Sequence, residues 1–273
     1  MDNTLYHYCS MGTLYKIIEG KNIRLSNALK TNDEKEFIYI IGVIKKVISP
    51  TGLKMLYGEF DYDSLYSLCS DINPHIACFS QNSNSLGQWR GYADDGRGIC
   101  IGFNKLYFEE IKNDKEKSFK IEEVIYNPNK QADTIKNIIY PAFDIDYQTG
   151  AFIGDALSQK DNKSKFIRTI SNIFRLYGSQ FKSKFYKEEE EIRFVHYCKD
   201  AKKLEYEQKK NDLISYIEIS LVQVDKINPI NEVRLGPQNM TNVHDMENFL
   251  EKHFPGQGIK VIPSTDSYRH QPI

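Results

Sequence analysis

Four consecutive glutamates end at Glu191 and are followed directly by an alternating apolar run. In a strand, successive side chains point to opposite faces, so Glu189, Glu191 and Arg193 share one face. Ile192 and Phe194 share the other, which we expect to be the core. Neighbours on one face of a strand are about 6–7 Å apart. Such a row at a cleft can bind a cationic centre or a sugar hydroxyl; the alternative interpretation is a solvated, acidic entry to a strand.

A glycine-rich passage holds a second set of candidate residues. The single tryptophan, Trp89, precedes four glycines within residues 91–102. Trp89 and Tyr92 offer flat surfaces on which a nicotinamide or adenine ring can stack, and Arg90 or Arg97 can contact a phosphate. The spacing matches neither a dinucleotide-binding fingerprint nor a Walker loop. The alternative interpretation is a hairpin connection with the tryptophan packed beneath it.

Two further polar residues lie in predicted strands. His7 stands between two tyrosines, and a lone strand histidine is more often a core or sheet-surface residue than a catalyst. Ser80 ends an apolar strand and opens a polar loop, but no GxSxG elbow surrounds it, which argues against a hydrolase nucleophile. The sequence contains no HExxH motif, no EF-hand loop and no metal-spaced cluster, so we expect no metal site.

Composition limits the class of protein. The chain has 273 residues, 40% of them apolar, and a net charge of −1. This is adequate for a packed core and gives no global field for nucleic acid or an anionic membrane. No apolar run approaches the ~20 residues of a membrane span. The five cysteines are scattered and the first residues lack a signal-peptide pattern, so we expect a reduced, cytoplasmic protein without membrane contacts.

These candidate residues need a sheet to bring them together. Apolar alternation predicts strands around residues 5–9, 23–27, 75–80, 99–103, 119–126, 189–195, 217–221, 233–235 and 259–262. Helical spacing predicts helices around residues 14–18, 31–48, 53–72, 131–143, 166–181 and 243–250. Residues 81–88 are expected to be a loop and 199–212 a charged, solvated stretch. The prediction is an α+β fold, a single domain over residues 1–273, with a mixed or antiparallel central sheet flanked by helices.

Several short motifs together resemble a known family. In order they match the bacterial family known as domain of unknown function 2971, and the resemblance spans almost the whole chain. The motifs are Leu5-Tyr6-His7-Tyr8, Ile23-Arg24-Leu25-Ser26-Asn27, Asn32-Asp33-Glu34-Lys35-Glu36, Ala77-Cys78-Phe79-Ser80, Trp89-Arg90-Gly91-Tyr92-Ala93, Gly98-Ile99-Cys100-Ile101-Gly102-Phe103, Glu189-Glu190-Glu191-Ile192-Arg193, Val233-Arg234-Leu235-Gly236-Pro237 and Ser267-Tyr268-Arg269.

The layout is also similar to ADP-ribosyltransferase folds, which have an early strand with His or Arg, a middle strand ending in serine and a late strand with Glu-x-Glu. This resemblance implies that NAD is the substrate. His7 would hold the nicotinamide ribose, Glu191 would stabilise the oxocarbenium-like ribose, and Glu189 would activate the acceptor. The cofactor-binding residues would be Tyr8, Ser80, Trp89, Arg90, Tyr92 and Arg193. We expect His7, Ser80 and Glu191 to line one pocket.

Three functions compete. The first is an NAD-consuming ADP-ribosyltransferase or glycohydrolase with a protein or nucleic-acid acceptor; the family resemblance suggests a role as a toxin or in anti-phage defence. The second is a non-enzymatic nucleotide-sensing or partner-binding module, in which the Trp89–Phe103 region docks the ligand. The third and weakest is a nuclease, which would need Asp33, Glu36, Glu189 and Glu191 to converge on a metal.

Overall fold

The computed structural model describes residues 3–30, 39–48, 74–114, 118–150, 159–198, 200–209 and 211–265. The predicted helix over residues 53–72 lies outside these ranges, as do Asp33, Glu36 and the closing Ser267-Tyr268-Arg269 motif. Of the predicted helix 31–48, residues 39–48 fall within them.

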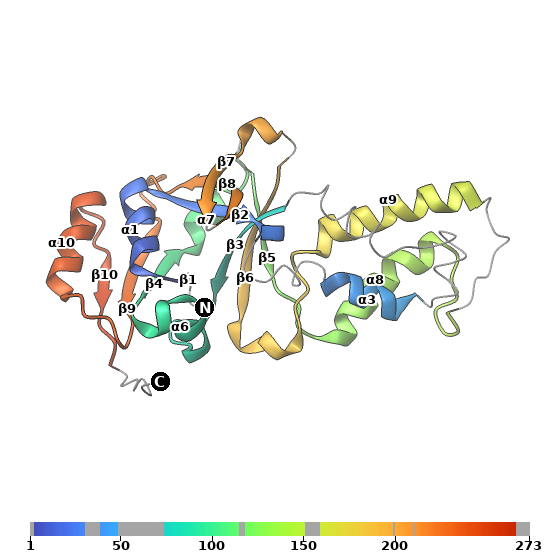
Figure 1. Cartoon of the computed structure of the whole chain (residues 1–273), viewed down its shortest axis with the longest axis horizontal. Coiled ribbons are helices and arrows are strands. Elements are labelled where there is room, and N and C mark those ends of the chain that lie inside the picture. Colours follow the sequence, from blue (N-terminus) through green and yellow to red (C-terminus); the bar gives the residue numbers. More distant parts are fainter. Residues whose placement is uncertain are drawn as a thin grey trace.

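Strands and helices alternate irregularly along the chain (Figure 1). The strands are β1 (Thr4–Cys9), β2 (Asn22–Asn27), β3 (Pro74–Ser80), β4 (Ile99–Asn104), β5 (Lys120–Glu123), β6 (Glu191–Tyr197), β7 (Glu205–Lys209), β8 (Asp212–Ser220), β9 (Ile230–Leu235) and β10 (Lys260–Ile262). The α-helices are α1 (Met11–Gly20), α3 (Tyr39–Val47), α6 (Leu86–Tyr92), α7 (Lys105–Ile111), α8 (Pro128–Ala142), α9 (Gln159–Tyr177) and α10 (Val243–His253). Short 3₁₀ turns are η1 (Ala28–Lys30), η2 (Asp94–Gly96), η3 (Lys184–Glu189) and η4 (Ala201–Lys203).

The described strands form one 10-stranded sheet in the order β10-β9-β4-β1-β3-β2-β8-β7, with β6 beside β3 and β5 beside β6. Neighbouring strands run antiparallel except for β10 and β9, which are parallel. The prediction of an α+β fold with a mixed, mostly antiparallel sheet is therefore confirmed. Elements that are distant in sequence meet in this sheet, so its formation depends on non-local pairing.

The sheet divides beside β3. Along one edge, β3 pairs with β6 over its whole length, from Pro74 to Ser80. On the opposite edge it pairs with β1 only at Ser80, and with β2 only at His75 and Ile76. Strands β1 and β2 therefore diverge and leave an opening beside the middle of β3. A side chain occupies part of that edge, because His7 Nδ1 lies 2.9 Å from the carbonyl oxygen of Cys78.

Two large apolar clusters pack on opposite faces of the sheet. The first contains Phe79, Ile192 and Phe194, and helices α1, α7 and α10 contribute to it. The second contains Ile76 and Val195 with the apolar residues of α3, α8 and α9, which lie together at one end of the molecule in Figure 1. This agrees with the predicted faces of β6. A smaller cluster beneath α6 is made of Tyr6, Tyr8, Trp89, Ala93 and Cys100.

Three elements differ from the sequence prediction. Helix α6 occupies part of the segment that was expected to be loop, and α7 was not predicted. Strand β7 lies inside the charged stretch 199–212, which has little apolar alternation of its own. It pairs with β8 over its whole length, from Glu205–Tyr216 to Lys209–Asp212. Backbone pairing in a hairpin, rather than a buried face, therefore makes this segment a strand.

Candidate functional site

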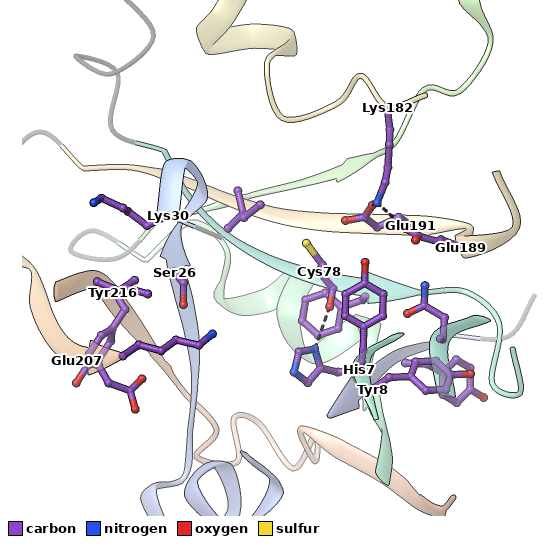
Figure 2. A pocket seen from close by; sticks show the side chains of 17 residues that line it. His7, Tyr8, Ser26, Lys30, Cys78, Lys182, Glu189, Glu191, Glu207 and Tyr216 are labelled. Atoms are coloured by element: carbon purple, nitrogen blue, oxygen red, sulfur yellow. Dashed lines mark hydrogen bonds and ion pairs between the residues drawn. The ribbon is translucent and has the colours of Figure 1, made fainter. Parts of the chain in front are cut away.

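A cavity of about 280 Å³ lies at the division of the sheet (Figure 2). This volume is close to the lower end of the ~300–1,000 Å³ typical of small-ligand pockets. Strands β1 and β3, helix α6 and the β7–β8 hairpin all contribute walls. Five of the residues proposed from sequence line it: His7, Tyr8, Tyr92, Glu189 and Glu191. The remaining four, Ser80, Trp89, Arg90 and Arg193, are not among its lining residues.

The two carboxylates reach the cavity by a different route from the predicted strand row. Strand β6 begins at Glu191, whereas Glu189 is the last residue of η3. Between them Glu190 adopts a left-handed conformation, with φ 44° and ψ 52°. That conformation is uncommon for a residue with a Cβ atom. The turn places Glu189 and Glu191 so that both reach the same ammonium group, that of Lys182.

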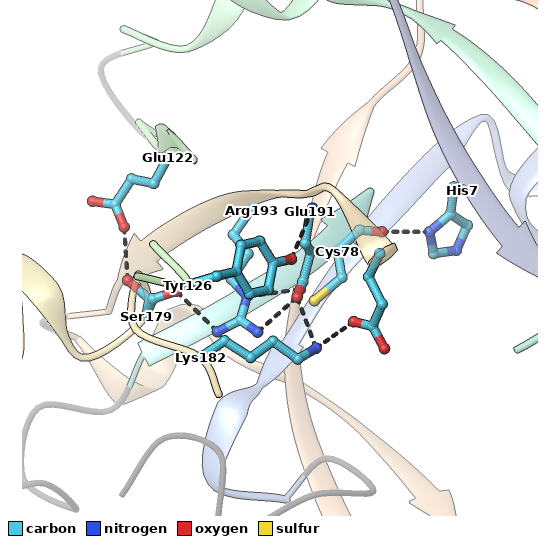
Figure 3. A network of polar contacts seen from close by, with 9 residues as sticks. His7, Cys78, Glu122, Tyr126, Ser179, Lys182, Glu191 and Arg193 are labelled. Carbon is cyan, nitrogen blue, oxygen red and sulfur yellow. Dashed lines mark hydrogen bonds and ion pairs between the residues drawn. The ribbon is translucent and has the colours of Figure 1, made fainter. Parts of the chain in front are cut away.

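Lys182 and Arg193 bind these carboxylates (Figure 3). The Lys182 Nζ atom lies 2.5 Å from Glu189 Oε2 and 2.9 Å from Glu191 Oε2. Arg193 donates from Nε to Glu191 Oε1 at 2.7 Å and from Nη2 to Glu191 Oε2 at 2.9 Å. A planar guanidinium matches both oxygens of a carboxylate in this way. Two cations and two anions therefore form a network without net charge.

Glu191 is the most constrained member of this network. Its side chain is only 5% exposed, whereas that of Glu189 is 17% exposed. Burial alone would raise the pKa of Glu191, but the charges of Arg193 and Lys182 and the hydrogen bonds from Arg193 outweigh it and lower the pKa to about 2. Glu191 is therefore ionised and fully engaged at neutral pH. Glu189 is the carboxylate that is more accessible to a ligand.

The lowered pKa predicts an acid-dependent loss of stability. Because the folded-state pKa of Glu191 lies below its ordinary value of 4.5, its contribution is complete above about pH 4.5 and is lost as the pH falls through about 2. The shift corresponds to about 3 kcal/mol of the free energy of unfolding. Urea unfolding at pH 6 and pH 3 measures this loss. In Glu191→Gln the fall between the two pH values should be smaller by about 2 kcal/mol, whereas in the exposed control Glu205→Gln it should equal that of the wild type. Equal falls in wild type and Glu191→Gln would contradict the assignment.

His7 presents an acceptor to the cavity. Burial lowers the pKa of its imidazole, while the hydrogen bond to the Cys78 carbonyl raises it by less. The ring is therefore neutral near pH 7. Because a carbonyl oxygen only accepts, the proton sits on Nδ1 and is donated to Cys78, which leaves Nε2 unprotonated. A neutral imidazole held in this way can accept a hydrogen bond from a ligand hydroxyl.

Tyr8 holds the segment before α6 in place. Its hydroxyl donates to the Asn82 carbonyl at 2.8 Å and accepts from the Ser85 amide at 3.0 Å. The Trp89 indole packs edge-on against Tyr8 and donates to Asn84 Oδ1 at 2.8 Å. Helix α6 thus forms despite two internal glycines because tertiary contacts fix it. Trp89 supports the cavity wall from behind and offers no stacking face, while Tyr92 at the end of α6 lines the cavity.

The other predicted residues lie near the cavity without lining it. The Ser80 hydroxyl donates to the Glu189 carbonyl at 2.7 Å, so it fixes the backbone that carries the accessible carboxylate. Arg193 lies behind Glu191, and Arg90 is exposed on α6. Sequence reasoning missed Lys182, which follows the apolar face of α9. Its carbonyl accepts from the buried amide of Gln131 at 2.9 Å. No local pattern distinguishes this lysine from a surface one.

In the described ranges, no group of three or more His, Cys, Asp or Glu side chains is placed to hold a metal ion. Two of the four carboxylates required by the nuclease hypothesis, Asp33 and Glu36, lie outside these ranges. None of the helices in the described part of the chain is both long and apolar enough to cross a membrane.

The fold and cavity define an α+β protein with a divided sheet and a buried ionic network at its opening. Residues 88–194 match the model of the protein family described as "Protein of unknown function (DUF2971)". This confirms the family resemblance for that segment, which runs from α6 to β6 and contains Tyr92, Lys182, Glu189, Glu191 and Arg193. No curated protein and no solved structure matches the chain, so the resemblance to ADP-ribosyltransferase folds has no support from these comparisons.

Proposed function

We propose that the chain binds NAD with its nicotinamide ribose in this cavity and cleaves the nicotinamide–ribose bond, as an ADP-ribosyltransferase or NAD glycohydrolase. One observation supports this most strongly: β1, β3 and β6 are neighbours, with Tyr6 paired to Ser80 and Ser80 paired to Glu191. In this register His7, Ser80 and Glu191 belong to neighbouring strands; His7, Glu189 and Glu191 line the cavity, and the Ser80 hydroxyl holds the Glu189 carbonyl.

The chemistry assigns separate roles to the two carboxylates. Cleavage of the bond leaves positive charge on the ribose, and the nicotinamide departs with the bonding electron pair as a neutral ring. Glu189, the more exposed carboxylate, stabilises that charge, more strongly where water is excluded. His7 Nε2 accepts a hydrogen bond from a ribose hydroxyl. Glu191 positions Lys182, which in turn holds Glu189. Water or an acceptor on a protein or nucleic acid then attacks the ribose and releases a proton.

The test is release of nicotinamide from NAD by the purified protein. Glu189→Gln removes the charge that stabilises the ribose and should lower the rate by about 10²–10³-fold. Glu188→Gln is the matched control, because Glu188 lies in the same 3₁₀ turn, is exposed and does not line the cavity. Absence of release from NAD alone, with protein acceptors and with nucleic-acid acceptors would reject the proposal. A role as a toxin or in anti-phage defence would be consistent with such activity.

A second candidate function is a non-enzymatic nucleotide-binding module. It is favoured by one observation: both oxygens of Glu191 and one of Glu189 are already engaged by Lys182 and Arg193. A carboxylate paired in this way stabilises a developing cation less than a free one. Titration calorimetry with NAD separates the two functions. Saturable NAD binding that is equal in wild type and Glu189→Gln, with no nicotinamide release by either, supports the binding module.

A further inference from the structure

The cavity continues beyond the carboxylates to a second polar group, which we call the hairpin end. It is formed by Ser26, Lys30, Lys209 and Tyr216, from β2, η1, β7 and β8. Figure 2 shows Glu189, Glu191 and Lys182 on one side of the cavity, Ser26, Lys30 and Tyr216 on the other, and His7 and Cys78 between them. The two polar groups therefore lie at opposite ends of one hollow.

Strand pairing accounts for this arrangement. Ser26 on β2 pairs with Tyr216 on β8, so their side chains are neighbours on one face of the sheet. Lys209 pairs with Asp212 at the turn of the β7–β8 hairpin. Lys30 Nζ lies 2.7 Å from Asp212 Oδ2 and ties η1 to that turn. The ammonium groups of Lys209, on the hairpin, and Lys30, on η1, therefore both lie at the end of the cavity that β2 borders.

The anions at the hairpin end already have cationic partners. Glu207 accepts from Lys16 at 2.5 Å and from Arg24 at 3.2 Å, and Asp212 accepts from Lys30. For Lys209 the described part of the chain shows no hydrogen bond and no ion pair within 4.0 Å. Its ammonium is on an exposed side chain that lines the cavity near Glu207, with which it interacts electrostatically without a close contact, so it can also approach an incoming anion.

The cavity is also lined by apolar side chains, among them Ile76, Phe79 and Ile214. At one end Glu189 is the accessible carboxylate of a network without net charge. At the other end Lys16 and Arg24 offset the carboxylate of Glu207, and Lys30 and Lys209 add ammonium groups. A ligand that is complementary to this distribution has a cationic ring near one end and an anionic group toward the other. NAD has this polarity, with a pyridinium ring on one ribose and a pyrophosphate on its far side. The distribution thereby selects one of the two possible orientations of the ligand.

We propose that the hairpin end is a phosphate subsite, in which Lys209, assisted by Lys30 and the hydroxyls of Ser26 and Tyr216, binds the pyrophosphate of a dinucleotide. This rests on the proposed function for the identity of the ligand and adds its orientation. The nicotinamide ribose lies at Glu189 and the phosphates lie at the hairpin. Ammonium and hydroxyl groups are the donors that phosphate oxygens accept from, and lysine binds phosphate as a point charge.

ADP-ribose is the decisive probe, because it retains the pyrophosphate and both riboses but cannot be cleaved at the nicotinamide bond. By titration calorimetry, Lys209→Ala should bind ADP-ribose about ten-fold more weakly than wild type, since one charge-assisted hydrogen bond is lost. Lys209→Arg should recover most of the affinity. Lys203→Ala, in the exposed η4 turn before the hairpin and outside the cavity lining, should bind as wild type does.

A second measurement separates this subsite from the proposed cleavage. Where wild type cleaves NAD, Lys209→Ala should raise KM for NAD about ten-fold and leave KM for nicotinamide riboside, which lacks phosphate, unchanged. Equal ADP-ribose affinity in wild type and Lys209→Ala overturns the phosphate subsite, whether or not NAD is cleaved. Weaker ADP-ribose binding in Lys209→Ala, with no nicotinamide release by wild type, supports the subsite and rejects only the cleavage.

Discussion

Replacing Arg193 with methionine should lower the free energy of unfolding by about 3–5 kcal/mol. Arg193 is 1% exposed, and its guanidinium binds both oxygens of Glu191 and donates from Nη1 to the Ser179 carbonyl at 2.9 Å. Methionine fills similar space but removes every one of these donors. Two carboxylates then remain with one ammonium, so a buried negative charge stays uncompensated. Guanidinium chloride unfolding of the variant and the wild type measures the loss.

The double variant Glu191→Gln/Arg193→Met is the matched control. It removes one positive and one negative charge together, so Lys182 and Glu189 remain as a neutral pair. Its loss of stability should be clearly smaller than the sum of the losses in the two single variants, by about 2 kcal/mol or more, because the members of one ionic network couple. Additive losses would show that the charges do not act as a unit. A loss below about 1 kcal/mol in Arg193→Met would contradict the buried pairing itself.

The alternation in β6 is enough to predict which face each side chain takes. Ile192 and Phe194 lie in the core and Arg193 faces the opposite side, as the period-2 pattern requires. The pattern fails at Glu189, because Glu190 turns the backbone into a left-handed conformation before the strand begins. A run of four glutamates has no glycine or asparagine to mark that turn. The alternation therefore predicts Glu189 in a strand, whereas the structure has it in a 3₁₀ turn. It still predicts Glu189 near Glu191, and both side chains contact Lys182.

The cationic partners and the cavity walls depend on contacts between distant segments. Lys182 meets Glu189 and Glu191 because the chain after α9 turns back onto β6, and nothing in its local sequence indicates this. Trp89 was predicted as a stacking surface because tryptophan and glycine together are typical of a ligand floor. Its indole is instead buried against Tyr8, through hydrogen bonds and ring packing that only the folded sheet creates. The phosphate subsite likewise depends on a charged hairpin strand that has little apolar alternation.

Replacing Gly98 with alanine should destabilise the protein by about 3 kcal/mol or more, because the added atom meets backbone that cannot move independently. A Cβ at Gly98 would lie 2.3 Å from the Cys9 carbonyl oxygen and 2.8 Å from that of Ala93. The Gly98 amide also donates to the Ala93 carbonyl at 2.8 Å. This close approach joins the end of β1 to the turn after α6, and so fixes the helix that presents Tyr92 to the cavity.

Gly91→Ala is the control for this substitution. Gly91 lies in α6, and no atom within 4 Å would meet its Cβ, so alanine there should raise the free energy of unfolding by up to ~1 kcal/mol through its higher helix propensity. Thermal and urea unfolding of both variants should therefore change in opposite directions. Gly98 fixes the position of α6, which carries Tyr92 at the cavity wall. If the Gly98→Ala variant still folds, it should therefore bind ADP-ribose more weakly than the Gly91→Ala variant. Similar stability in the two variants would show that the junction of β1 and α6 can relax, and that the cavity wall is not held by this contact.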